Sequence, residues 1–141
     1  MSKRSGGHER LPLRIFVLDS EALSLAVRGD RQMIARLDLA ARGQAEVVTS
    51  PMTMVEAFDG RVTEQRWDWV LSRLNVADIG RDHARLARRL LSEAKLHGHK
   101  YAIDAVLAVV ARQQKGQVTI FTSDVNDLEK LVPNSIVVKK V

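Results

Sequence analysis

RIFVLDS, residues 14–20, joins a short apolar run to an aspartate and is the most informative stretch of the sequence. The run Arg14–Leu18 is long enough for a buried strand but too short for a helix, and it stops at Asp19. A second stretch repeats the combination, because Gln117–Thr122 (QVTIFT) is followed two residues later by Asp124. In open α/β sheets, ligands bind outside the carboxyl ends of the strands. The sequence therefore predicts two aspartates at the ligand-binding edge of one sheet.

Outward from these stretches, short apolar runs alternate with segments of helical periodicity. We expect strands at residues 14–18, 46–49, 75–79 (a short strand or a connector), 117–122 and 135–138. We expect helices at residues 30–43, from 51 through Glu56, 63–74, 82–96, 101–114 and 125–131. Ser50 and Pro51 mark the start of the second helix, as an N-cap followed by proline at the first helical position. The alternation predicts an α/β fold, in which a mostly parallel sheet carries helices on both faces.

The 141 residues predict one folded domain at residues 13–141, preceded by a flexible basic tail at residues 1–12. The chain contains no cysteine, which excludes disulfides, thiolate zinc sites and a cysteine nucleophile. No apolar run approaches the roughly 18 residues of a membrane span, so we expect no membrane partner and a cytoplasmic protein. The formal net charge of +5, from 22 Lys+Arg against 17 Asp+Glu, favours a polyanionic partner without specifying one.

Two further carboxylates are candidates for the same sheet edge. Glu56 lies one turn into a helix that starts directly after the predicted strand at residues 46–49. Asp104 lies in KYAIDAVLAVVA among apolar neighbours, where a carboxylate is costly to bury without a partner. With Asp19 and Asp124 they form a set of four to which the pattern assigns no cation, and a divalent ion such as Mg²⁺ or Mn²⁺ satisfies such a set. Taken singly, Asp19 and Asp124 can instead cap helices, and Glu56 can be an ordinary surface residue.

Four motifs in the chain resemble, in the same order, those of PIN domains: VLDSEAL at residues 17–23, MVEAF at 54–58, AIDAVLAVVA at 102–111 and FTSD at 121–124. The resemblance runs from Arg14 over nearly the whole chain and implies a three-layer α/β/α fold. The family's acidic positions, which hold the metal and carry catalysis, fall on Asp19, Glu56, Asp104 and Asp124. Ser20 and Thr122 fall on hydroxyl positions that support the first and last of these. Asp127 also lies near the fourth motif, as a replacement for Asp124 or an aid to it.

The resemblance implies an endoribonuclease that uses one or two Mg²⁺ or Mn²⁺ ions to hydrolyse RNA phosphodiester bonds. Single-domain bacterial members of this size are similar to VapC toxins, which a small antitoxin protein holds inactive. A compact acidic pocket favours a single-stranded region of a structured RNA, because a phosphate deep in an A-form groove is hard to reach. The alternative is a catalytically inactive PIN-like module that binds RNA or protein. A phosphoaspartyl hydrolase or receiver domain is disfavoured, because Glu21 stands where such sites need a second aspartate and no suitable lysine follows Thr122.

Basic and aromatic residues predict where partners bind. Arginines recur at helical spacing and predict an RNA-phosphate surface, although the same pattern is typical of a solvated helix: Arg81, Arg85, Arg88 and Arg89. Trp69, rimmed by basic residues that include Arg61, Arg66 and Arg73, is the predicted contact for an antitoxin or for a second copy of the chain in a homodimer. His97 lies close to His99, but no further ligand has a suitable spacing, so we expect no zinc site.

Overall fold

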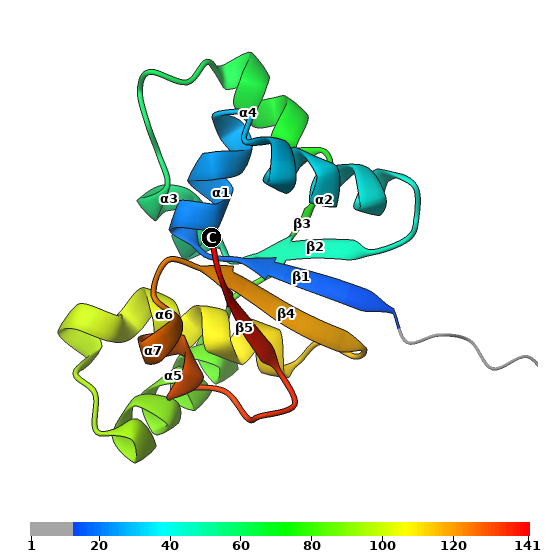
Figure 1. Ribbon diagram of the computed structural model, residues 1–141. Helices are drawn as coiled ribbons and strands as arrows, with labels where there is room; N and C mark the ends of the chain where they lie inside the picture. The colour runs from blue at the N-terminus through cyan, green and yellow to red at the C-terminus, as the bar shows by residue number, and fades with distance from the viewer. Residues whose placement is uncertain (1–12) are drawn as a thin grey trace, which may run out of the picture.

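The computed structural model describes residues 13–141, and the tail expected at residues 1–12 lies outside the described residues. Its strands are β1 (Arg14–Leu18), β2 (Glu46–Thr49), β3 (Asn75–Val76), β4 (Gln117–Thr122) and β5 (Val137–Lys140). They form one sheet in the order β3-β2-β1-β4-β5, and every neighbouring pair is parallel. The first strand is central, with β2 on one side and β4 on the other (Figure 1). The sheet predicted as mostly parallel is thus parallel throughout.

The helices between residues 13 and 141 are α1 (Ser20–Val27), α2 (Arg31–Ala41), α3 (Pro51–Glu56), α4 (Glu64–Leu71), α5 (Arg81–Ala94), α6 (Gly98–Arg112) and α7 (Val125–Glu129). Figure 1 shows α1, α2 and α4 on one face of the sheet and α5, α6 and α7 on the other, which confirms the expected three-layer α/β/α fold. The short helix α3 contacts both α1 and α6, so it lies where the two helical layers approach each other. None of these helices has the length and apolarity needed to cross a bilayer.

Alternating side chains of β1 divide the hydrophobic core between the two faces of the sheet. Phe16 and Leu18 pack with α1, α2 and α4, whereas Ile15 and Val17 pack with α6 and α7. This division follows from strand geometry, because successive side chains of a strand point to opposite faces. Since helices cover both faces, the central strands are apolar on both sides, as is usual in parallel sheets. A third apolar cluster joins α5 to α6, so α5 extends the outer layer.

The helix α1 is an element that the sequence patterns did not predict. Its buried residues Ala22, Leu23, Ala26 and Val27 occupy a broad part of its surface, so the sequence SEALSLAV shows no single apolar stripe. A start signal is nevertheless present, because the Asp19 carboxylate accepts the N–H of Ala22 at 2.9 Å. The capping role considered for Asp19 is therefore one of its functions in the fold.

The last strand begins two residues later than predicted, at Val137 rather than at residue 135. The N–H of Ile136 donates to the carbonyl of Pro133 at 3.0 Å, so the segment before the strand turns instead of extending. The strand β5 then pairs with the second half of β4, with Thr119 opposite Val137. The helix α6 also differs from the expectation, because it begins at Gly98 rather than at residue 101.

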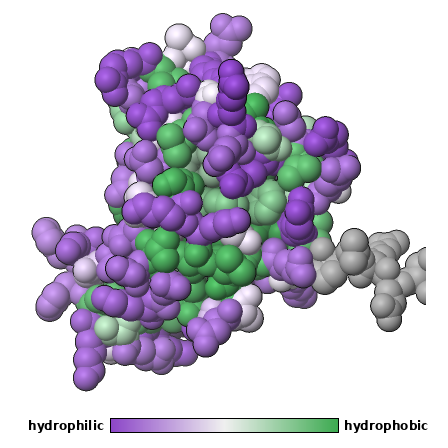
Figure 2. All heavy atoms as spheres, viewed as in Figure 1, coloured by the Kyte–Doolittle hydropathy of each residue, from purple (hydrophilic) through white to green (hydrophobic). Residues whose placement is uncertain are grey.

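Both edges of the sheet are protected against pairing with other chains. The strand β3 is only two residues long, and β5 carries Lys139 and Lys140. Figure 2 shows apolar residues gathered over β4 and β5 within a largely polar surface, and Val137 is 53% exposed there. Short edges and lysines on edge strands both discourage edge-to-edge association.

Gly116→Ala is expected to destabilise the protein by about 2 kcal/mol or more. Gly116 has a φ of +143°, and a Cβ at this position would collide with the carbonyl oxygen of Leu13. That oxygen accepts the N–H of Gln117 at 2.8 Å, so the clash falls on the start of the β1–β4 pairing. Chemical denaturation measures the loss. Gly80→Ala is the matched control, because Gly80 has a φ of −129° and open space around it; equal stability of the two variants would contradict the prediction.

Candidate functional site

Asp19 lies at the carboxyl end of β1, where its buried side chain joins two elements. Its side chain is the N-cap of α1, and its other carboxylate oxygen accepts the N–H of Ser123 at 3.1 Å, directly after β4. The residue is only 7% exposed. Burial raises the pKa of this carboxyl above its ordinary value, while the hydrogen bonds from Ala22, Thr122 and Ser123 oppose the rise. The carboxylate is therefore held in one orientation by donors from both sides of the β1–β4 pair.

Thr122 connects Asp19 to Asp124 through one buried hydroxyl group. The hydroxyl hydrogen bonds to the Asp19 carboxylate, and its oxygen accepts the N–H of Asp124 at 2.8 Å. The residue has no exposed surface. The position predicted to support the acidic residues thus contacts the side chain of Asp19 and the backbone of Asp124.

Three carboxylates converge where α6 faces the start of α7. Asp104 comes from α6, Asp124 is the N-cap of α7, and Asp127 lies in the first turn of α7. Each offers a carboxylate oxygen within 4.8 Å of the other two. Asp127, considered beside the fourth motif as a replacement or an aid, lies next to Asp124 in this cluster.

The electrostatics of Asp104 show that the other predicted residues lie close to this group. Burial is the largest cause that raises the pKa of Asp104 to about 6, followed by the negative charges of Asp124, Asp19, Glu56 and Asp127. A hydrogen bond with Asp124, partial burial and the negative charge of Asp124 also raise the pKa of Asp127. The charges of Asp19 and Glu56 thus act on Asp104, although neither residue belongs to the group of carboxylates within 4.8 Å of one another. Negative charges placed in this way oppose each other's ionisation.

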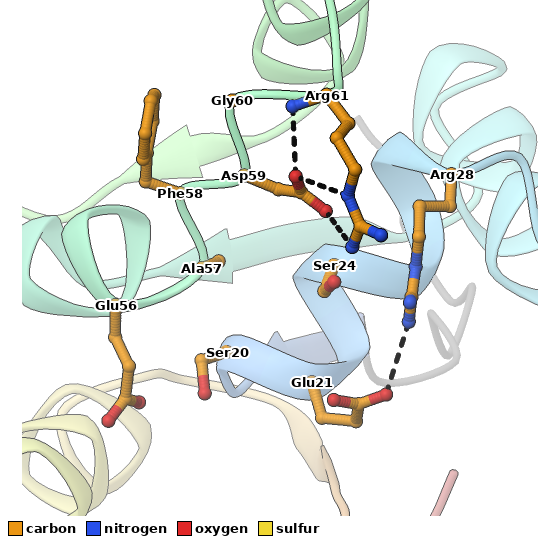
Figure 3. Close-up of a pocket in the computed structure, with 10 residues that line it drawn as sticks. All are labelled: Ser20, Glu21, Ser24, Arg28, Glu56, Ala57, Phe58, Asp59, Gly60 and Arg61. Carbon is orange, nitrogen blue, oxygen red and sulfur yellow. Dashed lines mark hydrogen bonds and ion pairs between the residues drawn. The ribbon is translucent and has the colours of Figure 1, made fainter.

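Glu56 reaches this region from the last turn of α3. It is exposed and lines a pocket of about 500 Å³ together with Ser20, the first residue of α1 (Figure 3). Glu56 and Ser20 thus stand on the side of the acidic group that opens toward α1 and the loop after α3. Ser20 was predicted as a supporting hydroxyl, and its place beside Glu56 is consistent with that role.

Few cations offset the acidic group. Among residues 13–141, the salt bridges include no Lys or Arg partner for Asp19, Asp104 or Asp124. Lys130 lies 3.8 Å from Asp127, at the outer side of the cluster. Lys140 donates to the carbonyl of Ser123 at 2.9 Å and so approaches the loop rather than a carboxylate. Carboxylate oxygens at these spacings, with little compensating charge, fit a hard divalent cation such as Mg²⁺ or Mn²⁺.

The four arginines predicted to bind RNA lie on α5, in the outer helical layer. Arg81, Arg85, Arg88 and Arg89 are all exposed. Arg85 pairs with Asp82 at 3.2 Å, which is an ordinary exposed helix pair. The placement agrees with a charged surface but does not bring these arginines into the acidic region.

Trp69, the predicted partner contact, is partly buried. Its ring packs at the edge of the core and lies between two guanidinium groups, 4.7 Å from that of Arg66 and 4.0 Å from that of Arg73. Arg66 also donates to the carbonyl of Val27 at the end of α1, so it joins α4 to α1. Arg61, expected on the rim of the same surface, lies instead in the loop before α4 and pairs with Asp59. Both guanidinium groups thus contact the indole ring, which is partly buried.

The histidine pair belongs to the start of α6. His97 is the N-cap residue and His99 lies in the first turn, and both are exposed. The carboxylate cluster described above is the only group of potential metal ligands between residues 13 and 141, and neither histidine is part of it.

The sequence patterns missed the basic side of the pocket beside Glu56. Arg28 and Arg61 line it, and neither lies in a motif or on a periodic face. One sign in the sequence pointed to Arg61 as a lining residue of this pocket, which is that Arg61 follows closely after Glu56 in the chain. Arg28 follows α1, the helix that the patterns did not identify, so its place beside Glu56 depends on an element that was not foreseen.

An all-parallel α/β sheet with carboxylates crowded at its carboxyl edge defines the structural class of this protein. A model of the PIN domain family matches residues 16–131, and the chain belongs to that family. One similar solved structure is VapBC2 from Rickettsia felis bound to a promoter DNA fragment, with a TM-score of 0.62 and 15% identity over 90% of this chain and 98% of that chain. Another is a toxin–antitoxin complex from Klebsiella pneumoniae, with a TM-score of 0.63 and 22% identity over 86% of this chain and 94% of that chain. No curated protein sequence matches the chain significantly.

Neutralising Asp104 is expected to stabilise the metal-free protein at neutral pH. The pKa of Asp104 is about 6 in the folded protein against an ordinary value of 3.8, so the folded state holds this proton more tightly than the unfolded state. Stability is therefore lost as the pH rises from about 4 to about 6. A shift of this size corresponds to about 3 kcal/mol, which we reduce to about 1–2 kcal/mol because the carboxyl is only half-buried.

Thermal melting in EDTA across this pH range measures the effect in the Asp104→Asn variant. We expect a higher melting temperature at pH 7 and a flatter pH dependence than in the wild type. Asp38→Asn removes one exposed carboxylate on α2 and is the control for net charge. If the pH dependence of the Asp104→Asn variant is identical to that of the wild type, ionisation of Asp104 does not lower the stability of the fold and the prediction is wrong.

Proposed function

We propose that the chain is a Mg²⁺- or Mn²⁺-dependent endoribonuclease that hydrolyses RNA phosphodiester bonds at the carboxyl edge of its sheet. The observation that carries the proposal is the convergence of Asp104, Asp124 and Asp127 within 4.8 Å of one another. Membership in the PIN domain family, whose members are typically nucleases, supports the same function.

The proposed ligands of one or two ions are Asp19, Glu56, Asp104 and Asp124, with Asp127 as an aid. A divalent ion supplies Lewis-acid chemistry at such a site, since it acidifies water and offsets negative charge on a phosphodiester. The protein contributes ligand geometry. The N–H groups of Ala22 and Ser123 hold Asp19, and the Thr122 hydroxyl links it to the backbone at Asp124. Hydrogen bonds of this kind orient metal ligands and raise metal affinity.

The openness of the acidic region supports a polymeric substrate. Asp124 and Glu56 are exposed and Asp104 is half-buried, so the carboxylates are accessible from outside. The formal charge of +5 favours a polyanion in general. A single-stranded region of a structured RNA suits the site best, because its backbone can bend toward carboxylates that are partly recessed.

We also propose that the chain is the toxin of a type II toxin–antitoxin pair. The two similar structures named above are of VapBC2 and of a toxin–antitoxin complex, and the matched regions span nearly all of the matched chains. The proposed partner is a small antitoxin protein that blocks the acidic region. A homodimer, also expected from the sequence, is compatible with this arrangement.

Asp104→Asn and Asp19→Asn are each expected to abolish RNA cleavage. Both substitutions remove a carboxylate charge and leave a side chain of nearly the same shape, so ion binding is lost. Asp104→Asn keeps the fold, whereas in Asp19→Asn the amide nitrogen faces one of the two N–H groups that the carboxylate accepts, so thermal melting checks that this variant is folded. The assay is incubation of purified protein with a mixed RNA and Mn²⁺, with and without EDTA, followed by gel analysis for discrete fragments. Asp38→Asn is the matched control and should cleave like the wild type. Equal cleavage by all four proteins would reject the proposed site, and Mn²⁺ binding without cleavage would favour an inactive binding module.

Expression of the wild-type chain in a bacterial host is expected to arrest growth. Expression of the Asp104→Asn variant is expected to leave growth unchanged. Co-expression of the product of the neighbouring reading frame should relieve the arrest if that product is the antitoxin. Colony counts after induction measure both effects. Normal growth with abundant wild-type protein would argue against the toxin role. The nuclease activity would still be tested separately by the cleavage assay.

A further inference from the structure

The pocket beside Glu56 is chemically different from the acidic cluster that it adjoins. Its volume is about 500 Å³, and it lies between α1 and the loop that connects α3 to α4. Glu56 and Ser20 form the side shared with the acidic region, and Arg28 and Arg61 bring two guanidinium groups to the lining (Figure 3). A molecule that reaches the carboxylates from this side therefore passes two guanidinium groups, each paired with a carboxylate that also lines the pocket, Glu21 or Asp59.

Asp59 holds Arg61 in place over the pocket. The Nε and Nη2 of Arg61 donate to the two carboxylate oxygens of Asp59 at 3.0 and 2.9 Å, and the backbone N–H of Arg61 donates to the same carboxylate at 2.9 Å. The Arg61 side chain is nevertheless 86% exposed. An exposed ion pair adds little to stability, so the main effect of these bonds is to orient the guanidinium. Because a guanidinium has five N–H donors, Nη1 is left for another acceptor.

Arg28 stands on the other side of the pocket. Its Nη2 donates to Glu21 at 3.3 Å, and both side chains are about half exposed. Its positive charge also helps to lower the pKa of Asp59, after the larger effects of the hydrogen bonds from Arg61, so the two arginines act on the same small region. Ser20 and Ser24 lie one turn apart on α1 and add hydroxyl groups to the lining.

We propose that Arg28 and Arg61 bind the phosphate of a nucleotide adjacent to the scissile bond, so that this pocket is the RNA-backbone subsite of the enzyme. The proposal rests on the nuclease function proposed above and names the path by which the strand enters. Arginine forks and hydroxyl donors are the groups that bind phosphodiester oxygens. Each guanidinium is already paired with a carboxylate, so the charge of each arginine is offset by that of its partner. A phosphate has to compete with these carboxylates for the arginines. Binding is therefore expected to be modest and sensitive to salt.

Arg61→Gln and Arg28→Gln test the subsite through RNA binding alone. Both are made in the Asp104→Asn background and measured in EDTA, so that cleavage does not consume the probe, which is a short fluorescent single-stranded RNA. Each variant is expected to bind about 5-fold more weakly at low salt, and each should reduce the slope of log K against log[salt] by about 0.7. Arg42→Gln is the matched control, because Arg42 is also an exposed arginine, but it lies between α2 and the start of β2, at the opposite edge of the sheet.

Unchanged affinity and salt slope in both Arg61→Gln and Arg28→Gln would overturn the proposal. An equal loss in Arg42→Gln would also overturn it, because the effect would then come from the net charge of the protein. Polyglutamate is added as a competitor. Displacement of RNA by polyglutamate at equal charge concentration would assign the pocket to anions in general, or to an acidic protein, and would reject an RNA-backbone subsite.

The binding assay and the cleavage assay fail independently. If the wild type cleaves RNA while both arginine variants bind normally, the nuclease proposal stands and the subsite is rejected. If the wild type does not cleave but both variants lose binding, the nuclease proposal is rejected and the pocket remains an RNA-binding site. Thermal melting of each variant is expected to match its parent, because both arginines are exposed and make no core contact, and it confirms that the fold is intact.

Discussion

The carboxyl group of Asp19 accepts N–H bonds from Ala22 in α1 and from Ser123 after β4, and it is almost completely buried. These bonds make one carboxylate the junction between the central strand pair and the first helix. The neighbouring Thr122 hydroxyl extends the junction to the backbone at Asp124. The site geometry therefore depends on the β1–β4 pairing, and a change in that pairing would move carboxylates on both strands together.

The acidic region lowers the stability of the folded protein. Its members raise the pKa of Asp104 because each added negative charge makes the next ionisation harder, and burial adds to the effect. A protein selected only for stability would replace such a group with paired or apolar residues. The surrounding structure tolerates it because Asp19 is satisfied by backbone donors, while Asp124 and Glu56 remain in contact with solvent. The cost is thus concentrated on Asp104, whose pKa is raised by burial and by the neighbouring negative charges.

Much of the fold was predictable from the sequence, because parallel strands with both faces covered give short apolar runs with clear ends. The meeting of Asp104 and Asp124 was predictable for a related reason, because one interrupts an apolar helix and the other follows an apolar strand. The helix α1 escaped notice because it is buried over a broad surface and shows no apolar stripe. The pairing of Arg61 with Asp59, and the approach of Arg28, depend on how α1 faces the loop after α3. No local pattern encodes that relation, which arises only when the layers pack.

The sheet order places the first strand of the chain at its centre and the fourth strand beside it. Asp19 and Ser123, which share a hydrogen bond, are 104 residues apart in the chain. During synthesis from the N-terminus, β1 can pair with β4 only after almost the whole domain has left the ribosome. A nascent or prematurely terminated chain that ends before Ser123 lacks both that donor and Asp124. The topology therefore assembles this edge of the sheet only when synthesis of the domain is nearly complete.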